Sequence, residues 1–183
     1  MPSAMVQEGI KHLCDEMPTM PGCTVQRVCA DEAKKVGASP YCKEFSILKD
    51  LCVDMPNMAG CANYSSMCSN ESVVQQCQSK ALPLPSTMAT SDLIEQMCGE
   101  MTMADCDRCQ KQGSLLQCDL LLVYSDLCLS MPEMSGCKAW KEMCAALPSW
   151  SLCPSSANPG GSAAARMADM YYQSLFLTQL FRW

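Results

Sequence analysis

The chain has few of the residues that build catalytic centres, nucleic-acid surfaces or membrane spans. His12 is its one histidine, so zinc or Cu(II) centres built on imidazole are not expected. Thirteen Lys and Arg stand against 19 Asp and Glu, giving a net charge of −6, and binding to nucleic acid phosphates would need a basic face. The chain has no apolar run of about 18 residues and no signal-like start. We therefore predict a soluble chain, or one that stops just before a membrane.

The chain is instead rich in sulfur, with 16 Cys and 16 Met against three Phe and three Trp. Two Cys bracket two Met in four boxes, three of them spaced CxxMxxMxxC and one a residue shorter. The boxes are Cys14, Met17, Met20, Cys23; Cys52, Met55, Met58, Cys61; Cys98, Met101, Met103, Cys106; and Cys128, Met131, Met134, Cys137. Soft thiolate and thioether ligands select Cu(I). The boxes therefore predict copper(I) as the bound ion.

Proline gives each full-length box a local shape. Pro18, Pro56 and Pro132 directly follow the first Met, and the residue before a proline is pushed out of the α region. The helix that carries the first Cys should therefore end there, and a new helix should carry the last Cys. We expect a helix-turn-helix joint with both Met at the bend and the two Cys close together. The shorter third box should close differently.

The two halves of the chain are a tandem duplication. Five Cys repeat with an offset of 76 residues, from Cys42 onto Cys118 through Cys77 onto Cys153. Apolar residues at helical spacing predict an all-α fold of short helical hairpins cross-linked by sulfur. We divide the chain into a first Cys-Met double hairpin (1–78), a linker (79–92), a second double hairpin (93–153), a Gly/Ser/Ala linker (154–166) and a Met/aromatic segment (167–183). Thr90 to Asp92 is expected to cap the helix after the first linker.

The boxes resemble the Cys-Met motif in the extracellular N-terminal regions of green-algal CTR-type copper transporters. Each full-length box is followed by another Cys after five or six residues, at Cys29, Cys68 and Cys144. Met167 and Met170, which precede an aromatic tail, resemble the segment that leads into the first transmembrane helix of that family, and the resemblance makes them further candidate copper ligands. The transmembrane part itself is absent. The resemblance implies copper capture for high-affinity uptake at the extracellular face of the plasma membrane, with the membrane part of a transporter as partner and 167–183 near the membrane surface.

Other interpretations of the sulfur residues stay open. Met can fill irregular gaps in a core, and Cys in a chain short of core residues can form structural disulfides. A soluble, possibly cytoplasmic copper buffer or chaperone would keep the thiols reduced, and a purely structural disulfide protein would bind no metal. No thioredoxin-like pattern surrounds Cys106 and Cys109, so we expect no enzyme activity. Asn63 and Asn70 begin glycosylation sequons that matter only on a secreted face.

Overall fold

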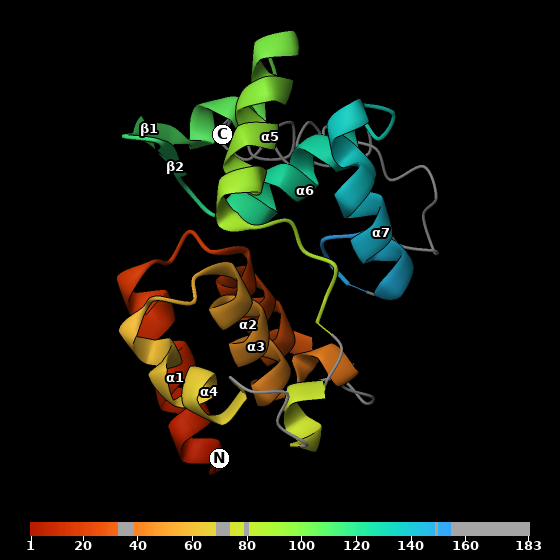
Figure 1. Ribbon diagram of the computed structural model, residues 1–183. Coiled ribbons are helices and arrows are strands. Elements are labelled where there is room, and N and C mark those ends of the chain that lie inside the picture. The colour runs from red at the N-terminus through yellow and green to blue at the C-terminus, as the bar shows by residue number, and fades with distance from the viewer. Residues whose placement is uncertain (33–38, 69–73, 79–80, 149, 155–183) are drawn as a thin grey trace, which may run out of the picture.

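The computed structural model describes residues 1–32, 39–68, 74–78, 81–148 and 150–154, and the predicted all-α fold is confirmed there. Helices dominate both halves of the chain (Figure 1). The α-helices are α1 (Ser3–Glu16), α2 (Pro21–Glu32), α3 (Glu44–Asp54), α4 (Ala62–Cys68), α5 (Thr87–Glu100), α6 (Leu120–Ser130) and α7 (Lys138–Ala146). Short 3-10 turns, among them η2 (Ala59–Cys61) and η5 (Ser135–Cys137), connect several of them.

Helix α1 shows how the sequence builds this fold. Val6, Ile10 and Leu13 recur at helical spacing and are all buried, while Met5 faces solvent. The buried face packs on α3 and η2. A Cβ atom at Gly60 in η2 would lie 2.7 Å from the Leu13 Cγ, so the close approach of α1 to this turn requires a glycine there.

Helix α5 begins earlier than the sequence predicts. Ser86 is its N-cap, and the Ser86 hydroxyl accepts a hydrogen bond from the Ala89 amide at 3.2 Å. The expected cap at Thr90 to Asp92 is therefore wrong, and the linker ends at Ser86. The physical reason is a long-range contact, because the Asp54 carboxylate accepts bonds from the Thr87 amide at 3.0 Å and the Thr87 hydroxyl at 2.6 Å.

A small antiparallel sheet replaces part of the expected second helical hairpin. Strand β1 (Gln110–Gln112) pairs with β2 (Leu115–Gln117), with Gln112 opposite Leu115. Gly113 in the turn between them has a φ of +64°, which glycine adopts without steric cost. The sequence did not predict this short hairpin, although the fold remains predominantly helical.

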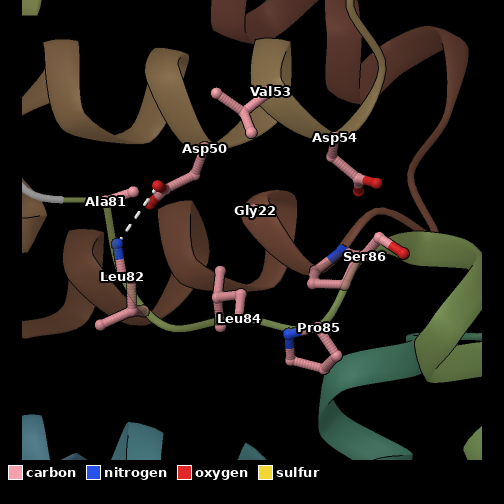
Figure 2. Close-up of a pocket in the computed structure, with 10 residues that line it drawn as sticks. Gly22, Asp50, Val53, Asp54, Ala81, Leu82, Leu84, Pro85 and Ser86 are labelled. Carbon is pink, nitrogen blue, oxygen red and sulfur yellow. Dashed lines mark hydrogen bonds between the residues drawn. The ribbon is translucent and has the colours of Figure 1, made fainter.

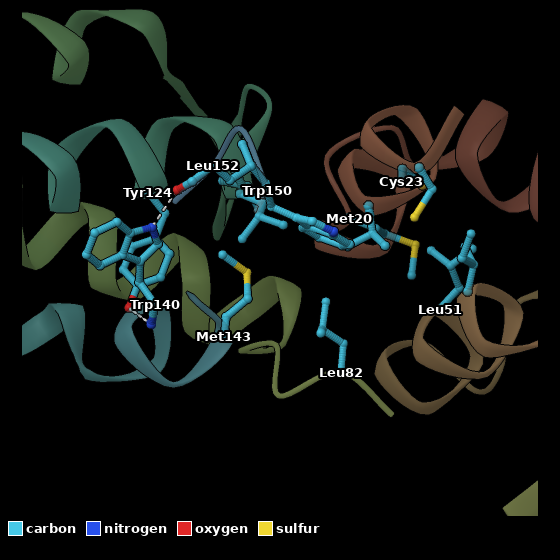
Figure 3. Packing of buried hydrophobic residues seen from close by; sticks show 14 of the residues in the cluster. Met20, Cys23, Leu51, Leu82, Tyr124, Trp140, Met143, Trp150 and Leu152 are labelled. Carbon is cyan, nitrogen blue, oxygen red and sulfur yellow. Dashed lines mark hydrogen bonds between the residues drawn. The ribbon is translucent and has the colours of Figure 1, made fainter. Parts of the chain in front are cut away.

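The two halves share one core. Figure 1 shows α1 to α4 on one side and α5 to α7 on the other, with residues 81–86, here called the strap, running between them. Helix α2 packs on α6, where Asp119 accepts a bond from the Thr24 hydroxyl at 2.5 Å and pairs with Arg27. Beside this contact the Trp150 ring extends toward Met20 across the junction (Figure 3).

None of the helices that the structure describes is both long and apolar enough to cross a bilayer. The Met/aromatic segment 167–183, with Met167 and Met170, lies outside the described residues, as does the linker 154–166 apart from Pro154.

Candidate functional site

The first Met of each full-length box ends a helix in the same way. Met17, Met55 and Met131 have φ values of −140°, −128° and −136° and ψ values of 76°, 72° and 72°. Each amide donates a hydrogen bond of 2.9 Å to the carbonyl four residues earlier. The helices therefore stop before proline, as predicted.

The second Met of each box joins the bend to the next helical turn. The amides of Met20, Met58 and Met134 donate to the carbonyl of the first Met at 3.3, 3.3 and 3.2 Å. Their carbonyls in turn accept from the amide of the closing Cys at 2.9, 3.0 and 3.0 Å. The three boxes are thus one repeated backbone motif, and the predicted helix-turn-helix joint with two Met at the bend is confirmed.

A disulfide closes every box. The Sγ atoms of Cys52 and Cys61 are 2.03 Å apart and those of Cys128 and Cys137 are 2.04 Å apart, which confirms the expected close corner. The sixteen cysteines form eight disulfides, and each disulfide joins two cysteines that are consecutive in the sequence. The other bonds join Cys14 to Cys23, Cys29 to Cys42, Cys68 to Cys77, Cys98 to Cys106, Cys109 to Cys118 and Cys144 to Cys153.

This pairing decides which sulfur atoms could bind a metal. No cysteine is free, and a disulfide sulfur has no thiolate charge to offer a metal ion. Among the residues that the structure describes, no group of three or more His, Cys, Asp or Glu side chains is arranged to hold a metal. In this oxidised state the thioethers of Met are the soft ligands that remain.

The shorter third box takes a different backbone path. Met101 has a ψ of 135°, and Met103 has a φ of −124° and a ψ of 147°. The Cys98 and Cys106 Cα atoms are nevertheless 5.8 Å apart, close to the 5.4 Å of Cys52 and Cys61. The missing residue is therefore absorbed between the two Met and the disulfide is kept.

The predicted Met ligands differ in their access to solvent. Met101 and Met131 are exposed, at 43% and 38%. Met20 is fully buried and lies at the junction of the two halves, facing Trp150 (Figure 3). The remaining box Met are partly buried and pack at the edge of the core: Met17, Met55, Met58, Met103 and Met134.

The fourth box forms a hollow on the surface. Its lining consists of Met131, Pro132, Glu133 and Met134, so both Met residues of the box border the same open space. The Glu133 carboxylate lies at 3.5 Å from the Lys141 ammonium in an exposed ion pair. Two neutral sulfur side chains beside one anionic side chain suit a soft monovalent cation.

A further loop has the same backbone geometry and was missed in the sequence. Leu147 and Trp150 stand three and six residues after Cys144, where the boxes have Met, and Pro148 follows the first of them. The Leu147 amide donates to Met143 at 3.0 Å, the Trp150 amide to Leu147 at 3.1 Å, and the Cys153 amide to Trp150 at 3.0 Å. The nine-residue Cys spacing and Pro148 are the signals in the sequence that point to this loop, although it has no Met at the two central positions.

This apolar loop acts as a natural control for the Met boxes. Leu147 and Trp150 are only 4% and 2% exposed, so carbon side chains at these two positions turn into the core. The bend and its disulfide therefore form without sulfur at the two central positions. Packing explains Met20, but it does not explain why Met131 stays exposed.

A second cavity lies away from the boxes, between α3 and the strap (Figure 2). It has a volume of about 160 Å³, and its lining includes Gly22, Asp50, Asp54 and Leu84. The Asp50 Oδ1 accepts a bond from the Leu82 amide at 3.3 Å, while its Oδ2 is buried without a partner. Burial raises the pKa of the Asp50 carboxyl from 3.8 to about 7, against the opposing Leu82 bond and Lys49 charge.

Comparison with known proteins gives one curated relative of interest. The chain is 42% identical over 147 residues to Protein P80 of Dictyostelium discoideum, a match that covers 79% of this chain and 27% of that protein. The chain thus spans about a quarter of the length of this relative, whose name states neither ligand nor activity. No protein-family profile matches the chain. No solved structure matches it.

Proposed function

We propose that this chain binds copper(I) through the methionine thioethers of its boxes and collects the ion for uptake by a CTR-type transporter. The observation that carries the proposal is the hollow at Met131 and Met134, where both Met residues of one box border open space. The apolar loop from Cys144 to Cys153 supports it, because the same bend forms there with buried Leu147 and Trp150.

In this proposal the disulfides shape the sites and the thioethers bind. A disulfide fixes both ends of each bend, so the two Met of a box are held near each other before copper arrives, which reduces the ordering cost of binding. Thioethers do not titrate, so the sites remain available at acidic pH, where thiolates would be protonated. The ligands are then Met17, Met55, Met58, Met101, Met103, Met131 and Met134, without the fully buried Met20.

The transporter partner rests on the resemblance of the boxes to CTR-type N-terminal regions. Such a domain would raise the local concentration of Cu(I) near a membrane entrance by carrying several weak sites on one chain. An acidic chain of net charge −6 also attracts cations at long range. Delivery would pass to the membrane part of the transporter, with 167–183 nearest to it.

An intracellular copper buffer or chaperone is the alternative. It would hold copper through Cys thiolates in a reducing compartment, with Cys14, Cys23, Cys52, Cys61, Cys98, Cys106, Cys128 and Cys137 among its ligands. The present pairing of all sixteen Cys favours the thioether proposal, since a buffer of that kind needs reduced thiols. A purely structural disulfide protein would bind no copper in either state.

Replacement of four box Met by Leu tests the proposal. M55L, M58L, M131L and M134L roughly conserve volume and should each change stability by less than about 1.5 kcal/mol, while the Cu(I) stoichiometry of the oxidised chain should fall. The matched control is M5L with M88L, because Met5 and Met88 are both 42% exposed and stand outside the boxes. Unchanged copper binding in the fourfold variant would show that these Met residues pack in the fold and do not bind copper.

A further inference from the structure

One exposed polar side chain on α4 has no role in the fold or in the boxes. Asn63 is exposed in the first turn of this helix, directly after the Cys52–Cys61 bend. Among the described residues no hydrogen bond holds its side-chain amide. Helix α4 also contains no buried residue. A large group attached at Asn63 would therefore displace nothing from the core.

The neighbouring side chains complete an acceptor sequence. Asn63, Tyr64 and Ser65 form Asn-X-Ser with X other than proline, the pattern that N-linked oligosaccharide transfer requires. Asn63 is exposed while Tyr64 is partly buried, and the centroid of the Tyr64 ring lies 5.8 Å from that of Phe45 on α3. Tyr64 therefore anchors the inner face of α4, and Asn63 remains at the surface.

The disulfides supply an independent argument about the compartment. Eight disulfides that consume all sixteen Cys form and persist in an oxidising environment such as the lumen of the endoplasmic reticulum. In eukaryotic cells that lumen is also where asparagine sequons receive glycans. The redox chemistry of the chain and its exposed sequon thus point to the same compartment.

We propose that Asn63 carries an N-linked oligosaccharide. The donor is an oligosaccharide attached to a polyprenyl diphosphate. The Asn63 side-chain nitrogen forms a bond to C1 of the first sugar, the bond from C1 to the diphosphate oxygen breaks, the polyprenyl diphosphate leaves, and the amide nitrogen loses one proton. No oxidant or reductant takes part.

The modification is specific to the first half of the chain. The 76-residue offset places Ala139 at the position of Asn63 and Trp140 at that of Tyr64. Trp140 is 3% exposed, and its indole donates to the Leu152 carbonyl at 2.9 Å, so α7 uses this turn for packing. A glycan at Asn63 gives α4 a polar cover that α7 lacks.

The test uses the full chain purified from the cells that make it. After release of N-glycans by an amidase in heavy-oxygen water, the peptide that contains Asn63 should carry a labelled aspartate at that position. The N70Q chain, which keeps only the Asn63 sequon, should still lose mass on deglycosylation. N63Q and S65A in that background should abolish the shift, and S65T, which keeps the hydroxyl, should retain it.

Two results would overturn the proposal. One is an Asn63 peptide that is unmodified in the disulfide-bonded protein. The other is a deglycosylation shift in N70Q that persists when N63Q is added. Neither result depends on copper binding, so this inference and the proposed function can fail separately.

Discussion

Met55 and Met131 end α3 and α6 with nearly the same backbone conformation, although 76 residues separate them. The φ angle is −128° at Met55 and −136° at Met131, and ψ is 72° at both. Leu147 ends α7 with φ −137° and ψ 60°, without a thioether. The bend is therefore a property of the proline and the disulfide, and the side chain at this position is free to serve another purpose.

Removal of a box disulfide should destabilise the fold by a predictable amount. C128A with C137A should lower the free energy of unfolding by about 2 to 4 kcal/mol, because the unfolded chain gains freedom. C68A with C77A is the matched control, since it opens a bond of the same sequence separation, 9 residues. Cys128 and Cys137 are fully buried whereas Cys68 and Cys77 are not, so the first variant should lose more through its cavity.

Denaturant unfolding under non-reducing conditions measures both losses. Equal stability of the wild type and C128A/C137A would show that this bond is absent from the protein in solution.

Protonation of Asp50 should make stability depend on pH. Its pKa is about 7 in the folded chain and 3.8 ordinarily, so folding favours the neutral acid. This stabilisation is complete below about pH 3.8 and is lost as the pH rises through about 7. Between these limits the wild type should lose about 1.4 kcal/mol per pH unit relative to D50N, whose side chain cannot ionise.

Lys49 and Tyr64 are the titratable neighbours that interact electrostatically with Asp50. The Leu82 amide and, after it, Lys49 lower the pKa of Asp50, and Lys49 also donates to the Cys77 carbonyl at 3.1 Å. Burial, and after it the charge of Asp50, raises the pKa of Tyr64. Thermal unfolding from pH 4 to 8 gives the comparison, with D92N, an exposed carboxyl on α5, as the control for loss of one charge. Parallel profiles for D50N and the wild type would contradict the burial of Asp50 under the strap.

Glycine replacements should rank by the space around each position. Gly60→Ala should destabilise by about 1 to 3 kcal/mol, because its Cβ would lie 2.7 Å from Leu13 Cγ and 3.1 Å from the Gly9 carbonyl. Gly136→Ala should cost less, since it meets only side chains, with the flexible Met97 at 3.2 Å. Gly99→Ala, with open space around it, should be neutral or stabilising by up to about 1 kcal/mol. Thermal unfolding of the three variants checks this order.

The residue directly before the second Met of a box should tune copper affinity. Glu133 occupies this position in the fourth box and Asn57 in the second. E133N should weaken Cu(I) binding at the fourth box by about 1.4- to 5-fold, the range expected for one exposed ion pair, and N57E should strengthen it at the second by a similar factor. Competition with a Cu(I) chelator measures both. Opposite signs would exclude the carboxylate as a favourable neighbour of the ion.

The repeated bends could be read from the sequence because they depend on local chemistry. Proline after Met55 and Met131 fixes where each helix ends, and the spacing of Cys52 and Cys61 brings them together. The complete disulfide pairing could not be read, since eight Cys in one half alone allow 105 arrangements.

The features that sequence reasoning missed depend on distant contacts or on other residue types. Helix α5 starts at Thr87 because Asp54, 33 residues away, binds its first turn. The β1–β2 hairpin depends on one glycine with positive φ, Gly113. The apolar loop after Cys144 does not match the Cys-Met box pattern, because Leu147 and Trp150 stand where the boxes have Met. Exposure of Met131 and burial of Met20 follow from tertiary packing, which identical motifs do not encode.

The most direct test of the account counts free thiols and bound Cu(I) on the same oxidised sample. Thiols are titrated under denaturing conditions without reductant, and Cu(I) is titrated against a competing chelator under anaerobic conditions at pH 5 and pH 7. We expect no free thiol, Cu(I) bound at both pH values, and a lower Cu(I) stoichiometry in M55L/M58L/M131L/M134L but not in M5L/M88L. Copper that binds only after reduction, with free thiols appearing in step, would contradict thioether capture and support thiolate buffering.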